Sequence, residues 1–235
     1  MPSLLRDLIR AWRGRDLLSQ MLDEFQRMLR DGEWMFATVG KVLRREEQPE
    51  VVHEAFFARD REINQREKDI RRRIVEHLSL RGEADVPACL VLMSVVKDAE
   101  RIGDYCKNIY EVACLYKGPL ETDRHMTELE SLREAVGGLF GQVGRAFVEA
   151  DGDLAVRLIL EAREVRARCD DLVPALMADE LPTPKAVAYA LLSRHYKRIA
   201  AHLANICTSV TGPVHEMDHS LAAEARIRKT YGMKP

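Results

Sequence analysis

Long apolar runs and paired cysteines are both missing from this 235-residue chain. No segment approaches the roughly 18 uncharged apolar residues of a membrane span, and the N-terminus, Met1 to Leu18, mixes arginine and aspartate among its leucines. We therefore expect neither a signal peptide nor direct membrane insertion. The five cysteines form no CxxC pair. They predict reduced, mostly buried thiols in a cytoplasmic protein rather than disulfides or a zinc knot.

An excess of charge of one sign is also missing. The 36 Lys and Arg nearly cancel the 38 Asp and Glu, which leaves a formal net charge of -2. A general nucleic-acid binder would show a clustered basic excess, so nucleic acid is not expected as a partner. The basic run Arg71–Arg73 is typical of the solvated face of a helix, and a phosphate or partner contact is the alternative.

Alternating apolar and polar residues, the pattern of a strand, are absent as well, and helical periodicity takes their place. Leu17, Met21, Phe25 and Met28 recur at steps of three and four residues. The breaks between such segments predict helices of roughly 25 to 32 residues, long for a globular protein. These breaks fall at 47–49, 81–82, 117–119, 151–152, 181–182 and 212–213.

The breaks divide the chain into two similar units of three long helices each. The third helices align at a constant offset, with 100–102 over 197–199 and 108–109 over 205–206. We therefore predict an all-α fold of two tandem three-helix bundles with short flanking helices. The predicted segments are 1–14 for an N-terminal flanking helix, 15–117 and 120–212 for the two repeats, and 213–235 for a C-terminal tail helix.

Acidic and amide side chains share one face on each of two helices of the first repeat. Glu100, Asp104 and Asn108 are spaced i, i+4, i+8 on the third helix. Asp60, Asn64 and Glu67 recur at i, i+4, i+7 on the second helix. If the two faces meet, their oxygen atoms would suit a hard or borderline cation. Spacing alone leaves a second interpretation open, in which these acids are ordinary surface charges.

The segment 97–109 carries a more specific signal. Its Glu-Arg-Ile-Gly-Asp core at 100–104, followed by Asn108 and Ile109, resembles the signature of the PhoU family of phosphate-signalling regulators. Asp60 with Ile63-Asn64 looks like the second-helix pattern of that family. The second repeat is similar through 194–199 and 205–206, so the resemblance covers residues 15–212.

The resemblance implies a non-enzymatic, metal-binding adaptor that links a phosphate ABC transporter to a membrane sensor histidine kinase, with a homodimer as the expected assembly. It implies metal ligands at Asp60, Glu67, Glu100 and Asp104, with Asn64 and Asn108 assisting and Arg101 orienting the carboxylates. Iron, zinc, manganese and magnesium are not distinguished by this ligand set.

The second repeat departs from the family pattern. Lys197 and Ala201 stand where Glu100 and Asp104 stand in the first repeat, and Ala162 and Arg166 appear to match Asp60 and Asn64. Such a set would repel a cation, so we predict one metal site, in the first repeat. The basic side chains of the second repeat are expected to form ion pairs, with anion binding as the alternative. The candidate bases are Arg166, Lys197, Arg198 and His202, and the candidate acids are Glu161, Glu164 and Asp170.

Three other classes of protein compete with this interpretation. The sequence His215–His219 spells HExxH, a zinc-protease motif, but it lies near the C-terminus with no distal ligand after it. ExxH occurs at Glu50–His53 and Glu216–His219, as in carboxylate-bridged di-metal enzymes, yet neither copy is predicted mid-bundle. A metal-free helical interaction scaffold is the third alternative.

Overall fold

The computed structural model describes residues 16–81, 85–118, 123–212 and 217. These residues form six α-helices of 26 to 33 residues and no strand, which confirms the predicted all-α class. The predicted flanking helices, 1–14 and 213–235, lie outside the described residues except for Met217. In chain order the helices are α2 (Asp16–Leu43), α3 (Pro49–Arg81), α4 (Val86–Leu115), α5 (Arg124–Glu149), α6 (Gly152–Met177) and α7 (Thr183–Thr211).

Two of the helix starts are capped by aspartates that stop the chain from fraying. The carboxylate of Asp123 accepts a hydrogen bond from the Met126 amide at 2.8 Å, and Asp151 accepts one from the Leu154 amide at 2.9 Å. Each cap satisfies a backbone donor that the first turn leaves free and stabilises its helix by about 1 kcal/mol. Ala150, between α5 and α6, takes a left-handed conformation with φ 49°, which lets the two helices join through a very short turn.

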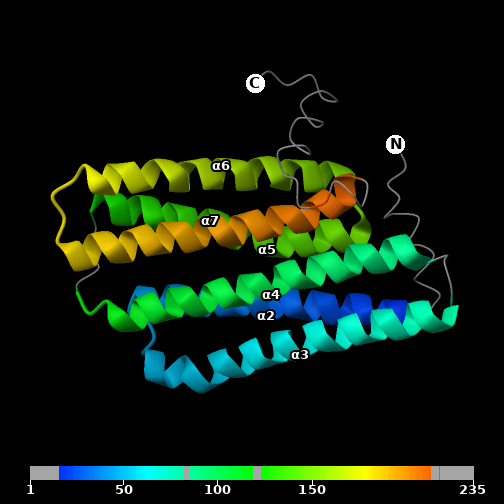
Figure 1. Cartoon of the computed structure of the whole chain (residues 1–235). Coiled ribbons are helices and arrows are strands. Elements are labelled where there is room, and N and C mark those ends of the chain that lie inside the picture. Colours follow the sequence, from blue (N-terminus) through cyan, green and yellow to red (C-terminus); the bar gives the residue numbers. More distant parts are fainter. Residues whose placement is uncertain (1–15, 82–84, 119–122, 213–216, 218–235) are drawn as a thin grey trace, which may run out of the picture.

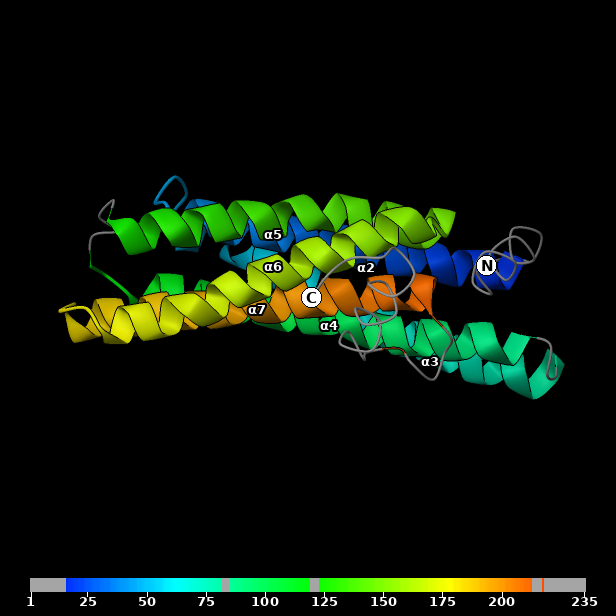
Figure 2. The same ribbon diagram turned by 90° about the horizontal axis from the view of Figure 1, so that it is seen from above.

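The six helices form two three-helix bundles that lie side by side (Figures 1 and 2). One bundle contains α2, α3 and α4, and the other contains α5, α6 and α7. They meet through α2 against α5 and α4 against α7, whereas α3 and α6 lie on the outside (Figure 1). No helix in the described part of the chain combines the length and hydropathy that crossing a bilayer requires.

Aromatic rings fill the seam between the bundles. Phe25 of α2 meets Phe147 of α5 edge-on with ring centroids 4.9 Å apart. Further along the seam, Phe36 lies 5.5 Å from Phe140 and 5.8 Å from Tyr196. Such pairs contribute about 0.5–1.5 kcal/mol each beyond the area they bury. The two repeats therefore share one continuous core.

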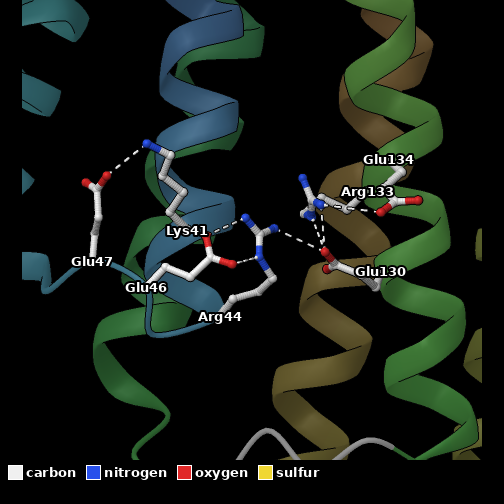
Figure 3. A network of polar contacts seen from close by, with 7 residues as sticks. All are labelled: Lys41, Arg44, Glu46, Glu47, Glu130, Arg133 and Glu134. Carbon is white, nitrogen blue, oxygen red and sulfur yellow. Dashed lines mark hydrogen bonds and ion pairs between the residues drawn. The ribbon is translucent and has the colours of Figure 1, made fainter.

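A surface network closes the same seam at the end of α2 (Figure 3). Arg44 pairs with Glu46 at 2.6 Å and with Glu130 of α5 at 3.1 Å, and Arg133 also reaches Glu130 at 2.6 Å. Burial raises the pKa of Glu130, but the two guanidinium groups outweigh it and leave that pKa below its usual range. Exposed pairs of this kind contribute at most about 1 kcal/mol each.

A buried polar contact joins α4 to α7. The Asp98 carboxylate is fully buried, and its Oδ1 lies 2.7 Å from His202 Nδ1 and 3.2 Å from Asn205 Nδ2. The Tyr105 ring lies 5.7 Å from the ring of His202 and 5.9 Å from that of His195. Because higher numbers on α4 meet lower numbers on α7, the two helices run antiparallel.

The cysteines are free thiols, as expected. Four of the five are buried, and Cys114 is half-buried. Burial raises the pKa of Cys89 to about 11, which leaves it a small hydrophobic side chain at neutral pH.

Candidate functional site

The two acidic faces of the first repeat meet along the line where α3 packs against α4, named the α3–α4 groove. On α4, Ile102, Cys106 and Ile109 are buried in the bundle core, which turns the acidic residues of the helix toward its edge. Gly103 of α4 faces α3, because a Cβ there would lie at ordinary contact distance from that helix, 3.4 Å from Ile63 Cδ1 and 4.0 Å from Asp60 Oδ1. The helix register therefore brings Asp60 beside the acidic face of α4.

Lys107 lies between two carboxylates of this groove. Its Nζ lies 3.0 Å from Asp60 Oδ1 on α3 and 2.9 Å from Asp104 Oδ1 on its own helix. Burial lowers the pKa of Lys107, but its bonds to the two carboxylates outweigh burial and raise that pKa above the ordinary lysine value. One ammonium thus bridges carboxylates of two helices.

The remaining predicted residues extend the network along the groove. Arg101 lies 3.1 Å from Asp104 and 3.6 Å from Glu100, and its role of orienting carboxylates stays a prediction. Burial, followed by the negative charges of Asp104 and Glu67, raises the pKa of Glu100 to about 7 against the opposing effect of Arg101. The carboxylates of Glu100, Asp104 and Glu67 therefore form one electrostatic unit, and Lys107 links Asp104 to Asp60.

Three further side chains border the unit. Asn64 Nδ2 lies 3.4 Å from Asp60 Oδ2, and Arg71 lies 3.0 Å from Glu67. Asn108, next to Lys107, is half-buried. The structure thus places the predicted acids and Asn64 along one groove. Three cations, Lys107, Arg101 and Arg71, lie among them.

The side chains of this groove carry the donor atoms that a metal ion prefers, but they are not arranged around one ion. Carboxylate and amide oxygens are the ligands that hard cations prefer. Among the described residues, however, no three His, Cys, Asp or Glu side chains are grouped as one ion would need. Lys107 stands between Asp60 and Asp104. The metal assignment of Asp60, Glu67, Glu100 and Asp104 stays a prediction.

Lys107 is the residue of this network that the sequence interpretation did not include. It lies inside the matched segment 97–109 and three residues after Asp104, a spacing that places both on one helix face. From that spacing the contact of Lys107 with Asp104 could have been predicted.

The second repeat shows the expected ion pairing. Lys197 Nζ lies 2.5 and 2.6 Å from the two oxygens of Asp170. His202 corrects the prediction, because it pairs with Asp98 of the other bundle rather than with an acid of its own repeat. The expectation was wrong because the antiparallel contact of α4 with α7 places the buried Asp98 carboxylate beside His202. Periodicity within one repeat does not reveal a contact between the two bundles.

The motifs of the competing classes do not meet in the described structure. His53, at the start of α3, contacts the Tyr110 hydroxyl at 3.2 Å rather than a cluster of acids. The HExxH sequence at 215–219 lies outside the described residues except for Met217.

The fold defines the protein as a duplicated three-helix-bundle protein with an acidic groove in one of its two copies. The PhoU domain matches the chain twice, over residues 15–113 and 129–210. The chain belongs to the PhoU family.

Two curated relatives and two solved structures are similar to the chain. Phosphate-specific transport system accessory protein PhoU homolog 1 of Thermotoga maritima is 30% identical over 129 residues, 52% of this chain and 54% of that protein. Phosphate-specific transport system accessory protein PhoU of Escherichia coli K12 is 27% identical over 154 residues, 63% of this chain and 64% of that protein. In both cases the chain spans less than two thirds of the relative.

The solved structures support the fold. The crystal structure of PhoU from Pseudomonas aeruginosa superposes with a TM-score of 0.75 at 22% identity and covers 83% of this chain and 95% of that one. The structure of the phosphate transport system regulatory protein PhoU from Streptococcus pneumoniae gives a TM-score of 0.67 at 21% identity, covering 83% and 94%.

Proposed function

We propose that this protein is a non-enzymatic regulator of phosphate uptake and of phosphate-responsive signalling. The observation that carries the proposal is the duplicated PhoU domain over most of the chain. Relatives that share it are named as accessory proteins of a phosphate-specific transport system. Two helical bundles with a shared core suit an adaptor, since together they present a large surface to other proteins.

The test is genetic complementation in the host of origin. A strain that lacks the gene is grown in phosphate-rich medium, and phosphate uptake and a phosphate-starvation reporter are measured. The wild-type gene is expected to restore normal uptake and to silence the reporter. Unchanged uptake and reporter levels in the deletion strain would reject the regulatory role.

The proposed partners are a phosphate ABC transporter and a membrane sensor histidine kinase, met in the cytoplasm by a homodimer of this chain. Affinity purification of the tagged full chain from membranes solubilised in detergent tests the partners, and light scattering of the purified protein tests the dimer. A monomer that recovers neither partner would limit the protein to some other use of the same fold.

We also propose that the α3–α4 groove binds a divalent or trivalent cation through Asp60, Glu67, Glu100 and Asp104. Asn64 and Asn108 would assist, and Arg101 would orient the carboxylates. A bound cation would supply positive charge that draws the two helices together. The support is the oxygen-rich donor set on facing helices and the raised pKa of Glu100, which is caused first by burial and then by the nearby carboxylates of Asp104 and Glu67.

Metal analysis of the purified chain tests the groove. Wild type is compared with Glu100→Ala/Asp104→Ala and with the control Glu161→Ala/Glu164→Ala, which removes two carboxylates of the outer helix α6. We expect metal in wild type and in the control but not in the groove variant. Equal metal content in all three would remove the site assignment.

A metal-free scaffold is the second candidate, and Lys107 favours it. The four carboxylates face three cations, Lys107, Arg101 and Arg71, so the groove is nearly neutral without any metal. In that case the protein would be the same regulator, and ion pairs within the groove would take the place of a bound metal.

A further inference from the structure

The ammonium of Lys107 bridges two helices. It lies within 3.0 Å of a carboxylate oxygen on each of two different helices, Asp60 on α3 and Asp104 on α4. Only a quarter of the Lys107 side chain is exposed, and the side chain of Asp60 is 12% exposed. A cation so placed joins the two helices in the way that a bridging ion would.

We propose that Lys107 is a tethered cation that occupies the place of a metal ion between Asp60 and Asp104, so that its ammonium and a divalent ion exclude each other there. The inference rests on the proposed metal site, because the ammonium and a divalent ion can compete only if that site binds an ion. It assigns to Lys107 control over the metal affinity of the groove.

Charge and space both support the exclusion. A carboxylate oxygen that accepts an ammonium at hydrogen-bond distance has a lone pair directed at that ammonium and not at a second ion. A divalent ion bound to the same two oxygens would lie within a few ångström of the ammonium, where like charges repel strongly in a half-buried groove. Metal binding therefore requires Lys107 to move away.

The second bundle uses a lysine in a comparable way. Lys197 of α7 binds Asp170 of the outer helix α6, as Lys107 of α4 binds Asp60 of the outer helix α3. In both bundles the third helix is thus fastened to the second by an ammonium. The difference is that Lys197 faces one carboxylate residue, whereas Lys107 faces two.

This difference supplies a matched control. Lys107→Met and Lys197→Met remove the same charge and the same helix contact, one from each bundle. Only Lys107→Met removes an ammonium that two carboxylate residues on facing helices share. Lys107→Gln is the second variant, because it keeps an N–H donor for the groove if the apolar side chain disturbs folding.

The experiment measures Mn²⁺ binding to the full chain after removal of metal with a chelator. Isothermal titration and the electron paramagnetic resonance signal of free Mn²⁺ give the affinity, and circular dichroism confirms the helical fold of each variant. We expect Lys107→Met and Lys107→Gln to bind Mn²⁺ about 10–100-fold more tightly than Lys197→Met and wild type. The gain should disappear in Lys107→Met/Asp104→Asn.

The outcomes separate this inference from the proposed metal site. If wild type binds no Mn²⁺ while Lys107→Met does, the tethered cation is supported and the metal site of the wild-type protein is rejected. If wild type and both Lys107 variants bind with equal affinity, the metal site stands and the role of Lys107 is overturned. Absence of binding in every folded variant overturns both.

Discussion

The buried contact between Asp98 and His202 predicts that one substitution will destabilise the whole molecule. In His202→Ala the Asp98 carboxylate stays fully buried and keeps only the Asn205 amide, 3.2 Å from Oδ1. Its Oδ2 already has no hydrogen-bond partner among the described residues. Removing a hydrogen-bond partner from a buried carboxylate costs about 1–3 kcal/mol. For a chain of this size that loss lowers Tm by about 2–12 °C.

Thermal and urea unfolding followed by circular dichroism measure the effect. The control is Lys197→Ala, which breaks the exposed pair with Asp170 and should cost less than about 1 kcal/mol. Asp98→Asn/His202→Ala replaces the isolated carboxylate by a neutral amide, and it should be more stable than His202→Ala alone. A loss in His202→Ala no larger than in Lys197→Ala would refute the reasoning, as would a double variant that gains nothing.

Three further substitutions test other parts of the fold. Asp123→Ala should cost about 1–2 kcal/mol at pH 7. Burial raises the pKa of Asp123, but hydrogen bonds from Lys185 and from the start of α5 outweigh burial and leave that pKa lowered. The contribution of Asp123 to stability is therefore present above the unfolded pKa of about 3.9 and is lost as pH falls. Urea unfolding of variant and wild type should therefore converge toward pH 3, and a difference that grows on acidification would contradict this. Gly103→Ala should raise the free energy of unfolding by up to about 1 kcal/mol, because the new Cβ meets Ile63 only at ordinary contact distance, and a lower Tm would show that the helices are closer than described. Phe36→Ala should cost about 3–5 kcal/mol by opening the aromatic seam between the bundles, and a two-state transition split into two steps would show that the bundles unfold separately.

The helix ends could be read from the sequence because they depend on local chemistry. Pro49 opens α3 and Gly212 follows α7, and such residues interrupt helices wherever they occur. The acidic groove was also predictable in part, since Glu100 and Asp104 share a face by spacing alone.

The cation in the groove and the partner of His202 could not be read in this way. Lys107 has several acids within reach of its long side chain, and only the position of α3 beside α4 decides that it bridges Asp60 and Asp104. The pairing of His202 with Asp98 depends on how the two bundles dock. Periodicity fixes the faces of a helix but not the register between helices that are far apart in the chain.

The antiparallel contact of α4 with α7 has a consequence for how the two copies could diverge. At the offset of the repeat, 195 − 98 = 202 − 105 = 97, His195 corresponds to Asp98 and His202 to Tyr105. The same contact therefore occurs twice, once as the carboxylate of Asp98 on His202 and once as the ring of Tyr105 on His195. An assembly of two identical repeats would have to use one chemistry in both places. Fusion into a single chain removes that constraint, so each half can specialise while the partner half retains the complementary side chain.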